Sequence, residues 1–459
     1  MMKGAYTDVV EAVGNTPIVR LNRLGAGVEA NIFVKLEYLN PGGSVKDRPA
    51  IQIIRDAEEA GLLRPGGTIV EATSGNTGMG LAMVAAIRGY KTICVMPDKM
   101  SEEKMAALRA LGAKVVVCPT SVEPDDPRSY YCVARRLAEE TPGGMLANQY
   151  HNPSNPKAHV LSTGPEIWEQ TGGEVDAIVV AMGTGGTITG LGSYLKEKKP
   201  SLQVIGADPV GSIYYDYFRT GRITPAHAYR VEGFGEDFIP STMDFSVVDE
   251  VIRVSDKDCF QWTRRLVREE GIYAGGSSGG AVCAAVRYAE KTGFKGNILV
   301  IIPDSAVRYL SKIFSDTWMK EGGYLEPEIG EETVGDLLRR SKTPLISASP
   351  GDQFGAVVTQ MKDHGISQLP VIDDRGRMLG LIAENDLLKA LVDQSANAST
   401  SIDGYLDNNF ALVEVSNRTS LVSQLFAQGK VVVVEDAGRV IGILTNIDFI
   451  DWISTRLTA

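Results

Sequence analysis

One lysine and three loops of small polar residues carry the chemistry that this sequence suggests. Lys46 lies in "LNPGGSVKDRPA", where it is either an ordinary surface cation or a group placed for its amine. The loop "EATSGNTGMG" follows an apolar run and opens a helical pattern, and the backbone N–H groups at such a turn bind anions. Its hydroxyl and amide donors suit a carboxylate or a phosphate, and the alternative is an ordinary polar turn.

A second glycine loop, "AMGTGGTITG", has two interpretations. Gly183 and Gly185, with Asp208 further along the chain, resemble a dinucleotide-binding fingerprint, but Ile188 stands where that fingerprint has Gly or Ala. The small residues at 183–187 fit better a nest for a single phosphate at a helix start. A third loop, "YAGGSSGGAV", is either a tight turn or a place where a serine hydroxyl meets a flat ring.

One cofactor, pyridoxal 5'-phosphate, uses all of these features. Its aldehyde needs a lysine amine for a Schiff base, its phosphate needs a cradle, and its ring nitrogen needs a partner. The carboxylate of an amino-acid substrate then takes the remaining helix start. The companions of Lys46 therefore indicate that its amine binds the cofactor.

The elements that would position these loops alternate between strands and helices from about residue 65 to 325. Apolar strands are expected at "GGTIVEAT", "KTICVMP", "KVVVCP", "VDAIVVAMG", "LQVIGADP" and "GNILVIIPDS", with helical patterns between them. This alternation predicts a mostly parallel sheet covered on both faces, with ligands at the carboxyl ends of the strands. We expect one α/β catalytic domain over residues 1–325.

A different pattern begins near residue 326. The acidic segment 326–332 is predicted to be a linker, and two similar units follow over 333–395 and 403–459. Each unit reads as strand, turn, strand and helix, and Asp386 and Asp448 take the same place in the two copies. Such a repeat predicts two α+β domains packed face to face.

Composition and charge exclude several classes of function. A net charge of −11 without a Lys/Arg run argues against sequence-independent nucleic-acid binding. No apolar stretch reaches the ~18 residues of a membrane span, and the N-terminus lacks the pattern of a signal peptide. The five cysteines and four histidines are scattered without the spacing of a disulfide framework or a metal site. We therefore expect a cytoplasmic protein with no metal, membrane or nucleic-acid partner.

The motifs together resemble the cystathionine beta-synthase family, within the fold-type II (tryptophan synthase beta-like) group of pyridoxal-phosphate enzymes. The segments "GNTPIVRLN", "KLEYLNPGGSVKDR", "EATSGNTG", "NQYHNPSNP", "GTGGT", "GADPVGS", "VEGFGEDFIP" and "GGSSGG" follow the order of that family. The C-terminal repeat is similar to a tandem CBS-domain module. The resemblance implies a parallel-sheet α/β catalytic domain followed by an α+β CBS-domain pair.

The resemblance also implies roles for individual residues. It makes Lys46 the carrier of the cofactor and the acid and base of the reaction. The remaining cofactor contacts are implied at Asn76 for the ring 3-hydroxyl, at Gly183, Thr184, Gly185, Gly186 and Thr187 for the phosphate, and at Ser277 for the pyridine nitrogen. The substrate carboxylate is implied at Thr73, Ser74, Thr77 and Gln149, with Tyr150 near the ring.

The implied reaction is a β-replacement in which the thiol of L-homocysteine displaces the hydroxyl of L-serine, catalysed by a carbon-oxygen (hydro-) lyase. A serine at the ring nitrogen does not hold a proton there as a carboxylate would, which suits elimination followed by addition. The enzyme alternatives are a cysteine synthase (O-acetylserine sulfhydrylase) acting on O-acetylserine and sulfide, and a serine/threonine dehydratase. The non-enzyme alternative is a nucleotide-sensing regulatory protein with an inactive catalytic domain.

Two features depart from the family pattern, and the C-terminal repeat predicts a regulatory ligand. Glu236 stands where better-known members carry tyrosine, and it could assist proton transfer, tune specificity or face solvent. The residues before "GNTP" are too few for a haem-binding extension, so no haem is expected. In the second repeat Thr445 and Asp448 form the Thr-x-x-Asp that CBS domains offer to a ribose, whereas Ala383 replaces the threonine in the first. This predicts an adenosyl ligand, S-adenosylmethionine, near Asp448, with a degenerate dimerisation module as the alternative, and the resemblance implies a homodimer or homotetramer.

Overall fold

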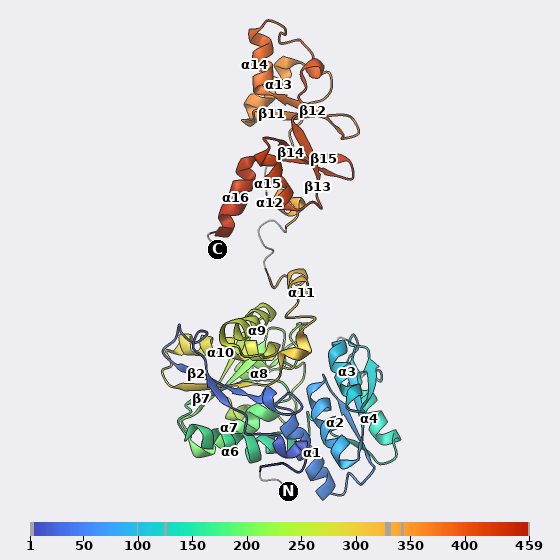
Figure 1. The fold of residues 1–459 in the computed structure, drawn as a ribbon, viewed down its shortest axis with the longest axis vertical. Coiled ribbons are helices and arrows are strands. Elements are labelled where there is room, and N and C mark those ends of the chain that lie inside the picture. The colour runs from blue at the N-terminus through green and yellow to red at the C-terminus, as the bar shows by residue number, and fades with distance from the viewer. Residues whose placement is uncertain (1–3, 99, 124–125, 326–331, 341–343, 458–459) are drawn as a thin grey trace. The chain divides into compact units, whose positions relative to one another are not determined.

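The computed structural model of the chain describes residues 4–98, 100–123, 126–325, 332–340 and 344–457. The chain separates into two compact units, Met1–Leu325 and Glu326–Ala459, each with its own sheets and apolar clusters (Figure 1). The predicted linker at 326–332 lies, except for Glu332, outside the described residues. Among the helices of the described ranges, none combines the length and the apolar character that crossing a bilayer requires.

A six-stranded sheet forms the larger part of the N-terminal unit. Its order is β1 (Ile18–Arg20), β2 (Asn31–Leu36), β10 (Asn297–Ile302), β7 (Ala177–Ala181), β8 (Gln203–Pro209) and β9 (Glu250–Val254). Only β1 runs antiparallel to its neighbour, and Val300 of β10 pairs with Val34 of β2 and Val179 of β7. The central strands are buried on both faces, as their continuous apolar sequences require.

Helices cover both faces of this sheet (Figure 1). On one face α9 (Asp256–Glu270) and α10 (Gly276–Thr292) pack in one apolar cluster. On the other face α6 (Gly164–Thr171) and α7 (Gly186–Lys198) pack in a second cluster. The predicted α/β layering is therefore confirmed for this sheet.

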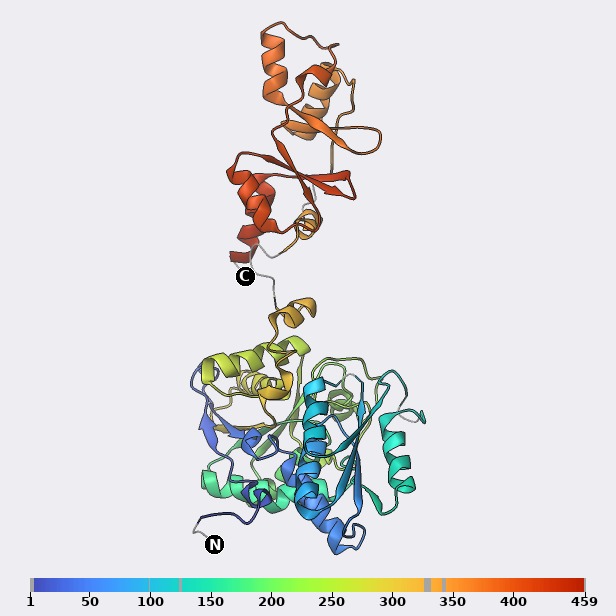
Figure 2. The same ribbon diagram turned by 45° about the vertical axis from the view of Figure 1, so that its right-hand side comes forward.

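The other strands of the unit form a second, fully parallel sheet (Figure 2). Its order is β5 (Lys114–Cys118), β4 (Lys91–Pro97), β3 (Thr68–Ala72) and β6 (Gly144–Leu146). Ile69 packs with α1 (Asp47–Glu59) and α2 (Asn76–Arg88), whereas Val70 faces α4 (Tyr130–Glu140) on the opposite side, and α3 (Glu102–Ala110) lies against β5. The sequence predicted a single sheet. The division into two corrects this, and it agrees with the tendency of large twisted sheets to split.

Short helices connect these layers. They are η1 (Val9–Ala12), η2 (Glu37–Leu39), α5 (Ser154–Ala158), the π-helix η3 (His159–Thr163), α8 (Tyr214–Thr220), η4 (Phe245–Val247), η5 (Ala306–Tyr309) and α11 (Asp316–Glu321).

The C-terminal unit contains the predicted repeat of strand, turn, strand and helix. The first copy is β11 (Gln368–Ile372), β12 (Met378–Ala383) and α14 (Glu384–Val392), and the second is β14 (Val431–Asp436), β15 (Arg439–Leu444) and α16 (Asn446–Leu457). Both hairpins are antiparallel and carry a register shift in their first strand. The other elements are α12 (Val334–Arg340), α13 (Phe354–His364), η6 (Ile402–Tyr405), β13 (Phe410–Glu414) and α15 (Thr419–Ala427).

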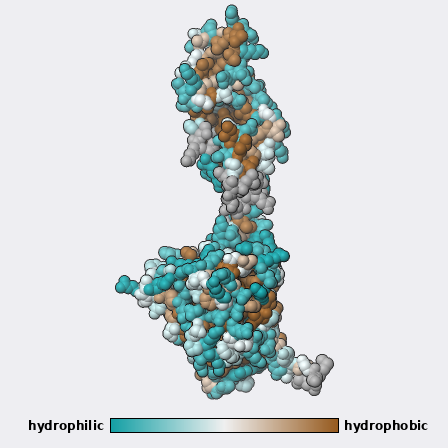
Figure 3. Space-filling model, turned by 90° about the vertical axis from the view of Figure 1, so that its left-hand side faces the viewer, coloured by the Kyte–Doolittle hydropathy of each residue, from teal (hydrophilic) through white to brown (hydrophobic). Residues whose placement is uncertain are grey.

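Each copy has its own apolar cluster, one around Phe354 and Leu369 and one around Val432 and Trp452. Helix α12 precedes the first copy in sequence but packs in the cluster of the second, through Val334 and Leu337. Apolar side chains also reach the surface of this unit, and Figure 3 shows them as brown patches among hydrophilic residues.

Candidate active site

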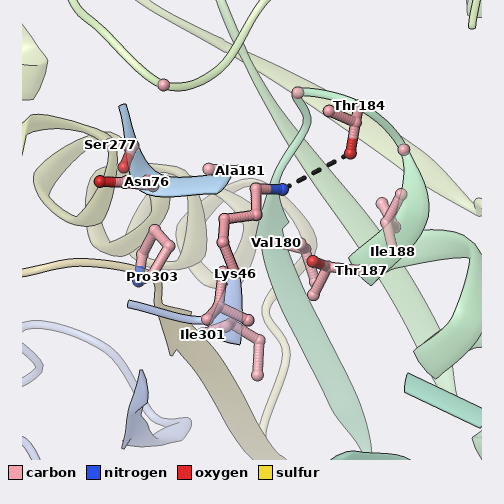
Figure 4. A pocket seen from close by; sticks show the side chains of 14 residues that line it. Lys46, Asn76, Val180, Ala181, Thr184, Thr187, Ile188, Ser277, Ile301 and Pro303 are labelled. Atoms are coloured by element: carbon pink, nitrogen blue, oxygen red, sulfur yellow. Dashed lines mark hydrogen bonds between the residues drawn. The ribbon is translucent and has the colours of Figure 1, made fainter. Parts of the chain in front are cut away.

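A cavity lies at the carboxyl ends of strands β7 and β10 (Figure 4). It brings together most of the residues predicted to bind the cofactor. Seven of them line it, namely Lys46, Asn76, Gly183, Thr184, Gly185, Thr187 and Ser277. The other lining residues are Val45, Val180, Ala181, Ile188, Gly233, Ile301 and Pro303. The position agrees with the general rule for ligands in open α/β sheets.

Lys46 immediately precedes α1 and extends its side chain into this cavity (Figure 4). Its Nζ donates a hydrogen bond to Thr184 Oγ1 at 3.5 Å. Burial lowers the pKa of Lys46 to about 8, although the nearby carboxylates of Glu236, Asp304 and Glu71 act in the opposite direction. At neutral pH this amine is therefore unprotonated far more often than an ordinary lysine, as a nucleophile or base requires.

The loop at 183–187 connects β7 to the first turn of α7 and is shaped by its glycines. Gly185 has φ +84°, and a Cβ there would lie 2.6 Å from Met243 Cα. A Cβ on Gly186 would lie 2.0 Å from Asn155 Oδ1, and the amide of Asn155 donates to Thr184 Oγ1 at 2.9 Å. The loop thus presents small residues and backbone N–H groups at a helix N-terminus, which fits a phosphate group.

Thr187, at the far side of this loop, is held by a histidine that the sequence did not reveal. His159 is fully buried in the π-helix η3, with Nε2 3.2 Å from Thr187 Oγ1 and Nδ1 2.8 Å from Thr163 Oγ1. Burial holds the pKa of His159 well below its usual value, so the ring is neutral. No local motif marks His159 in the sequence, because the contact joins separate helices.

Asn76 and Ser277 face the cavity from the starts of two helices, α2 and α10 (Figure 4). Asn76 Nδ2 donates to Asp304 Oδ2 at 2.8 Å, while Asn76 Oδ1 is buried without a hydrogen-bond partner in the structure. Ser277 is buried and lines the cavity, whereas Ser278 is also buried but is not among the lining residues. Asn76 therefore keeps one N–H donor and its carbonyl oxygen for a ligand, and Ser277 offers a buried hydroxyl. Together these groups fit the polar atoms of a pyridine ring.

The residues predicted for the substrate carboxylate come from two segments, and none of them lines the cavity. Thr73 and Ser74 precede α2 and Thr77 lies in its first turn, whereas Gln149 follows β6. Thr73 Oγ1 accepts the N–H groups of Gly75 and Gly78, at 3.0 and 3.4 Å. Thr77 Oγ1 donates to Gln149 Oε1, and Ser74 is the half-buried member of the set. Thr73 therefore shapes the loop through its own hydroxyl, and Ser74 is the more accessible donor.

The buried side chain of Glu71 supports the backbone of Gln149. Glu71 accepts the N–H of Asn148 at 2.7 Å and that of Gln149 at 3.3 Å. Burial raises the pKa of Glu71 to about 8. This support was not predicted, because residue 71 has the sequence pattern of a buried strand.

Tyr150 belongs to an aromatic group rather than to the cavity wall. Its ring centroid lies 5.7 Å from that of Tyr131 and 5.3 Å from that of Phe238. Burial raises the pKa of Tyr150 well above its usual value, and the charge of Glu236 acts in the same direction. Glu236 is half-buried, with its N–H donating to Ser212 Oγ at 3.1 Å, and its charge acts on both Lys46 and this aromatic group.

A buried ion-pair network anchors the start of α1 behind Lys46. The guanidinium of Arg48 pairs with Glu37 at 2.8 Å and with Glu166 at 2.9 Å. Lys35, which is fully buried, pairs with Glu166 at 2.7 Å. The network ties α1 to β2 and α6, and it fixes the backbone from which Lys46 projects.

The residues predicted for a regulatory ligand form the start of α16 in the C-terminal unit. Thr445 N and Oγ1 both donate to Asp448 Oδ2, at 2.8 and 2.6 Å, and Asp448 N donates back to Thr445 Oγ1 at 3.2 Å. Thr333 and Asp336 make the same reciprocal bonds at the start of α12. Both pairs therefore cap helices, whereas Ala383, the residue before α14, provides no side-chain cap.

Comparison with known proteins agrees with this geometry. A model of the pyridoxal-phosphate dependent enzyme family matches residues 9–304, and the CBS-domain model matches residues 334–393. The cystathionine beta-synthase of Oryctolagus cuniculus is 39% identical over 98% of this chain and 85% of its own length. That of Apis mellifera is 38% identical over 99% of this chain and 93% of its own length.

Other relatives match only the catalytic unit. Cysteine synthase 1 of Emericella nidulans is 42% identical over 70% of this chain and 88% of its own length. The crystal structure of O-ureido-L-serine synthase superposes with a TM-score of 0.62 at 38% identity, over 69% of this chain and 99% of that chain. The chain belongs to the family of pyridoxal-phosphate dependent enzymes and, within it, to the cystathionine beta-synthases.

Proposed function

We propose that the chain catalyses the replacement of the hydroxyl of L-serine by the thiol of L-homocysteine, forming L-cystathionine and water. One observation carries the proposal: Lys46 shares a cavity with a phosphate nest, Asn76 and Ser277, in a chain that resembles cystathionine beta-synthases along nearly its whole length. The cysteine synthase relatives leave the C-terminal unit unmatched.

The residues of the cavity fit pyridoxal phosphate. The amine of Lys46 would hold its aldehyde, the loop at 183–187 its phosphate, Asn76 its 3-oxygen and Ser277 its ring nitrogen. When bound, the cofactor supplies an aldehyde that links to an amine and a ring that stabilises negative charge at the substrate Cα. The neutral hydroxyl of Ser277 would not hold a proton on the ring nitrogen as a carboxylate would, and this would moderate that stabilisation.

Lys46 would move the protons of the reaction. Once the amine of the substrate has displaced it from the aldehyde, the amine of Lys46, with a pKa of about 8, could take the proton from the substrate Cα and pass it to the departing hydroxyl, which would leave as water. The incoming thiol would give its proton to the amine of Lys46 and add as thiolate, and Lys46 would return that proton to Cα. In the structure the bond from Nζ to Thr184 Oγ1 holds the amine inside the cavity.

The carboxylate of the amino acid would bind at the N-terminus of α2. The supporting features are the hydroxyl donor of Ser74 and the N–H groups at this helix start. Thr77 and Gln149 are bonded to each other beside it, and the N–H of Gln149 is held by Glu71. Tyr150 and its aromatic neighbours then border the site on the side of Glu236. A role for Glu236 in proton transfer or specificity stays a prediction.

A side-by-side assay tests the proposal. Purified protein loaded with pyridoxal phosphate is given serine with homocysteine, and separately O-acetylserine with sulfide. We expect cystathionine as the faster product. Faster cysteine formation would favour cysteine synthase instead. A protein that stays colourless after added pyridoxal phosphate, and is inactive with both pairs, would favour a regulatory protein with an inactive catalytic unit.

The C-terminal unit is proposed to bind an adenosyl ligand, of which S-adenosylmethionine is the candidate, near Thr445 and Asp448. Support comes from the Thr-x-x-Asp pair at a helix start and from the CBS-domain match in the first copy. A ligand there would alter catalysis only if it bound two states of the protein with different affinities. The homodimer or homotetramer, the absence of haem and the cytoplasmic location stay predictions.

A further inference from the structure

A buried carboxylate joins the two residues that face the cofactor ring. Asp304 follows strand β10 and is 1% exposed. Its Oδ2 accepts hydrogen bonds from Asn76 Nδ2 at 2.8 Å and from the hydroxyl of Tyr309 at 2.6 Å. Its backbone carbonyl accepts the N–H of Gly275 at 3.0 Å, two residues before Ser277. Asp304 therefore touches the supports of both ring partners.

The second carboxylate oxygen of Asp304 has little room to move. A Cβ on Gly275 would lie 2.2 Å from Asp304 Oδ1, so this oxygen is packed against the loop that leads to Ser277. The same oxygen is buried without a hydrogen-bond partner in the structure. The backbone of residue 304 also bridges Ser44, two residues before Lys46. The carboxylate is thus fixed in position by its own surroundings.

The contact with Asp304 determines which end of the Asn76 amide can face it. A carboxylate has only acceptors, so it binds the NH₂ group of the amide and excludes the carbonyl oxygen. Tyr309 donates to the same oxygen, and burial raises the pKa of Tyr309 well above its usual value, which keeps this phenol a donor. Asn76 is left with one further N–H and an unused carbonyl in fixed places.

We propose that Asp304 is a positioning residue that fixes the amide of Asn76 so that the 3-oxygen of the cofactor meets an N–H donor. This rests on the proposed function, in which Asn76 binds that oxygen. An N–H donor stabilises the 3-oxygen as an anion, whereas a carbonyl stabilises it as a hydroxyl. Asp304 would therefore favour the cofactor form with an anionic 3-oxygen and a protonated link to Lys46 over the form with a 3-hydroxyl. The first form absorbs visible light and the second absorbs in the near ultraviolet.

The test is the absorption spectrum of the loaded protein in the variant D304N. An amide at 304 can donate or accept, so Asn76 is no longer held in one orientation. We expect the ratio of the near-ultraviolet band to the visible band to rise by at least about tenfold, the lower end of the range that corresponds to losing one hydrogen bond to a charged group. D304A, which removes the acceptor altogether, is expected to shift the ratio in the same direction and serves if D304N does not fold.

Two controls separate this role from general damage. The first control is D208N. Asp208, near the end of β8, is another fully buried acidic residue, but it accepts the N–H of Tyr215 and does not contact Asn76. Y309F removes a bond to Asp304 but leaves the bond to Asn76. Both variants are expected to keep the ratio of the unmodified protein, and a shift in Y309F as large as that in D304N would overturn the proposal.

A double variant tests whether Asp304 acts through Asn76. In an N76A background D304N should shift the ratio no further, and an undiminished shift there would contradict the proposal. Borohydride reduction and peptide mapping accompany each spectrum. A tag on residue 46 with an unchanged ratio in D304N would refute the role of Asp304 alone, whereas an untagged residue 46 in the unmodified protein would refute the proposed function.

Discussion

Replacing Gly185 with alanine tests the nest at 183–187. Gly185 has φ +84°, a conformation that costs an L-residue roughly 1–2 kcal/mol. A Cβ there would also lie 2.6 Å from Met243 Cα and 2.9 Å from Met243 N, which are backbone atoms that cannot swing aside. Overpacking of this kind adds roughly 1–3 kcal/mol. We therefore expect G185A to lower the free energy of unfolding of the catalytic unit by about 2–5 kcal/mol.

The matched control is G221A. Gly221 follows α8 with φ +68°, and a Cβ there would meet nothing within 4 Å. This substitution carries only the conformational part, roughly 1–2 kcal/mol. The difference between the two variants is therefore the contribution of the contact with Met243.

Calorimetry measures both effects, with and without pyridoxal phosphate. The transition that the cofactor shifts identifies the catalytic unit, because ligand binding stabilises only the fold that binds it. G185A should also weaken cofactor binding. Each 1.4 kcal/mol of the strain that acts against cofactor binding raises the dissociation constant about tenfold. Equal stability and equal cofactor affinity in G185A and G221A would refute the view that this loop closely surrounds the phosphate.

Three further predictions follow from the site and the C-terminal unit. Replacing Arg48 by methionine removes the guanidinium that pairs with the fully buried Glu37, and should lower the free energy of unfolding in denaturant by about 3–5 kcal/mol. The control Arg88→Met, at a partly exposed ion pair, should change it by less than about 1 kcal/mol. Equal effects of the two substitutions would contradict the role of the network. Only the neutral form of an amine attacks an aldehyde, and the pKa of Lys46 is about 8. The rate at which the cofactor-free protein takes up pyridoxal phosphate, measured by stopped-flow absorbance, should therefore rise with pH and level off above about pH 8. A rate that keeps rising up to the pKa of an ordinary lysine would show that burial does not lower the pKa of this amine. Calorimetric titration should detect S-adenosylmethionine binding that Asp448→Ala weakens by at least about tenfold, as expected for losing a hydrogen-bonded carboxylate, and unchanged binding in the variant would place the ligand elsewhere.

The sequence predicted the parts of the site that depend on local pattern. Lys46, the loop at 183–187 and Ser277 each lie at a helix start marked by glycines, and strand–helix alternation places such starts at one edge of a sheet. These features need only the neighbouring residues. They were therefore visible without any knowledge of how distant segments meet.

The supports of these residues were not predictable in the same way. Asp304 lies 228 residues from Asn76, and His159 lies 28 residues from Thr187 in a separate helix. Their roles arise from contacts between segments, and neither sits in a motif of its own. The division of the catalytic unit into two sheets was missed for the same reason, because strand order depends on pairing between segments that are distant in sequence.

Local pattern also has more than one meaning. The Thr-x-x-Asp pair that suggested a ribose site at Thr445 and Asp448 is, in the structure, a reciprocal helix cap. Thr73, expected to bind the substrate, uses its hydroxyl on its own turn. In both places short polar side chains serve the backbone next to them, which sequence alone does not distinguish from a ligand contact.

Borohydride reduction of the loaded protein, followed by proteolysis and mass spectrometry, tests the central claim most directly. We expect a single pyridoxyl-modified peptide that contains Lys46, and no modified peptide in Lys46→Ala. Modification of a different lysine, or of none, would contradict the assignment of the cavity at 46, 76, 183–187 and 277.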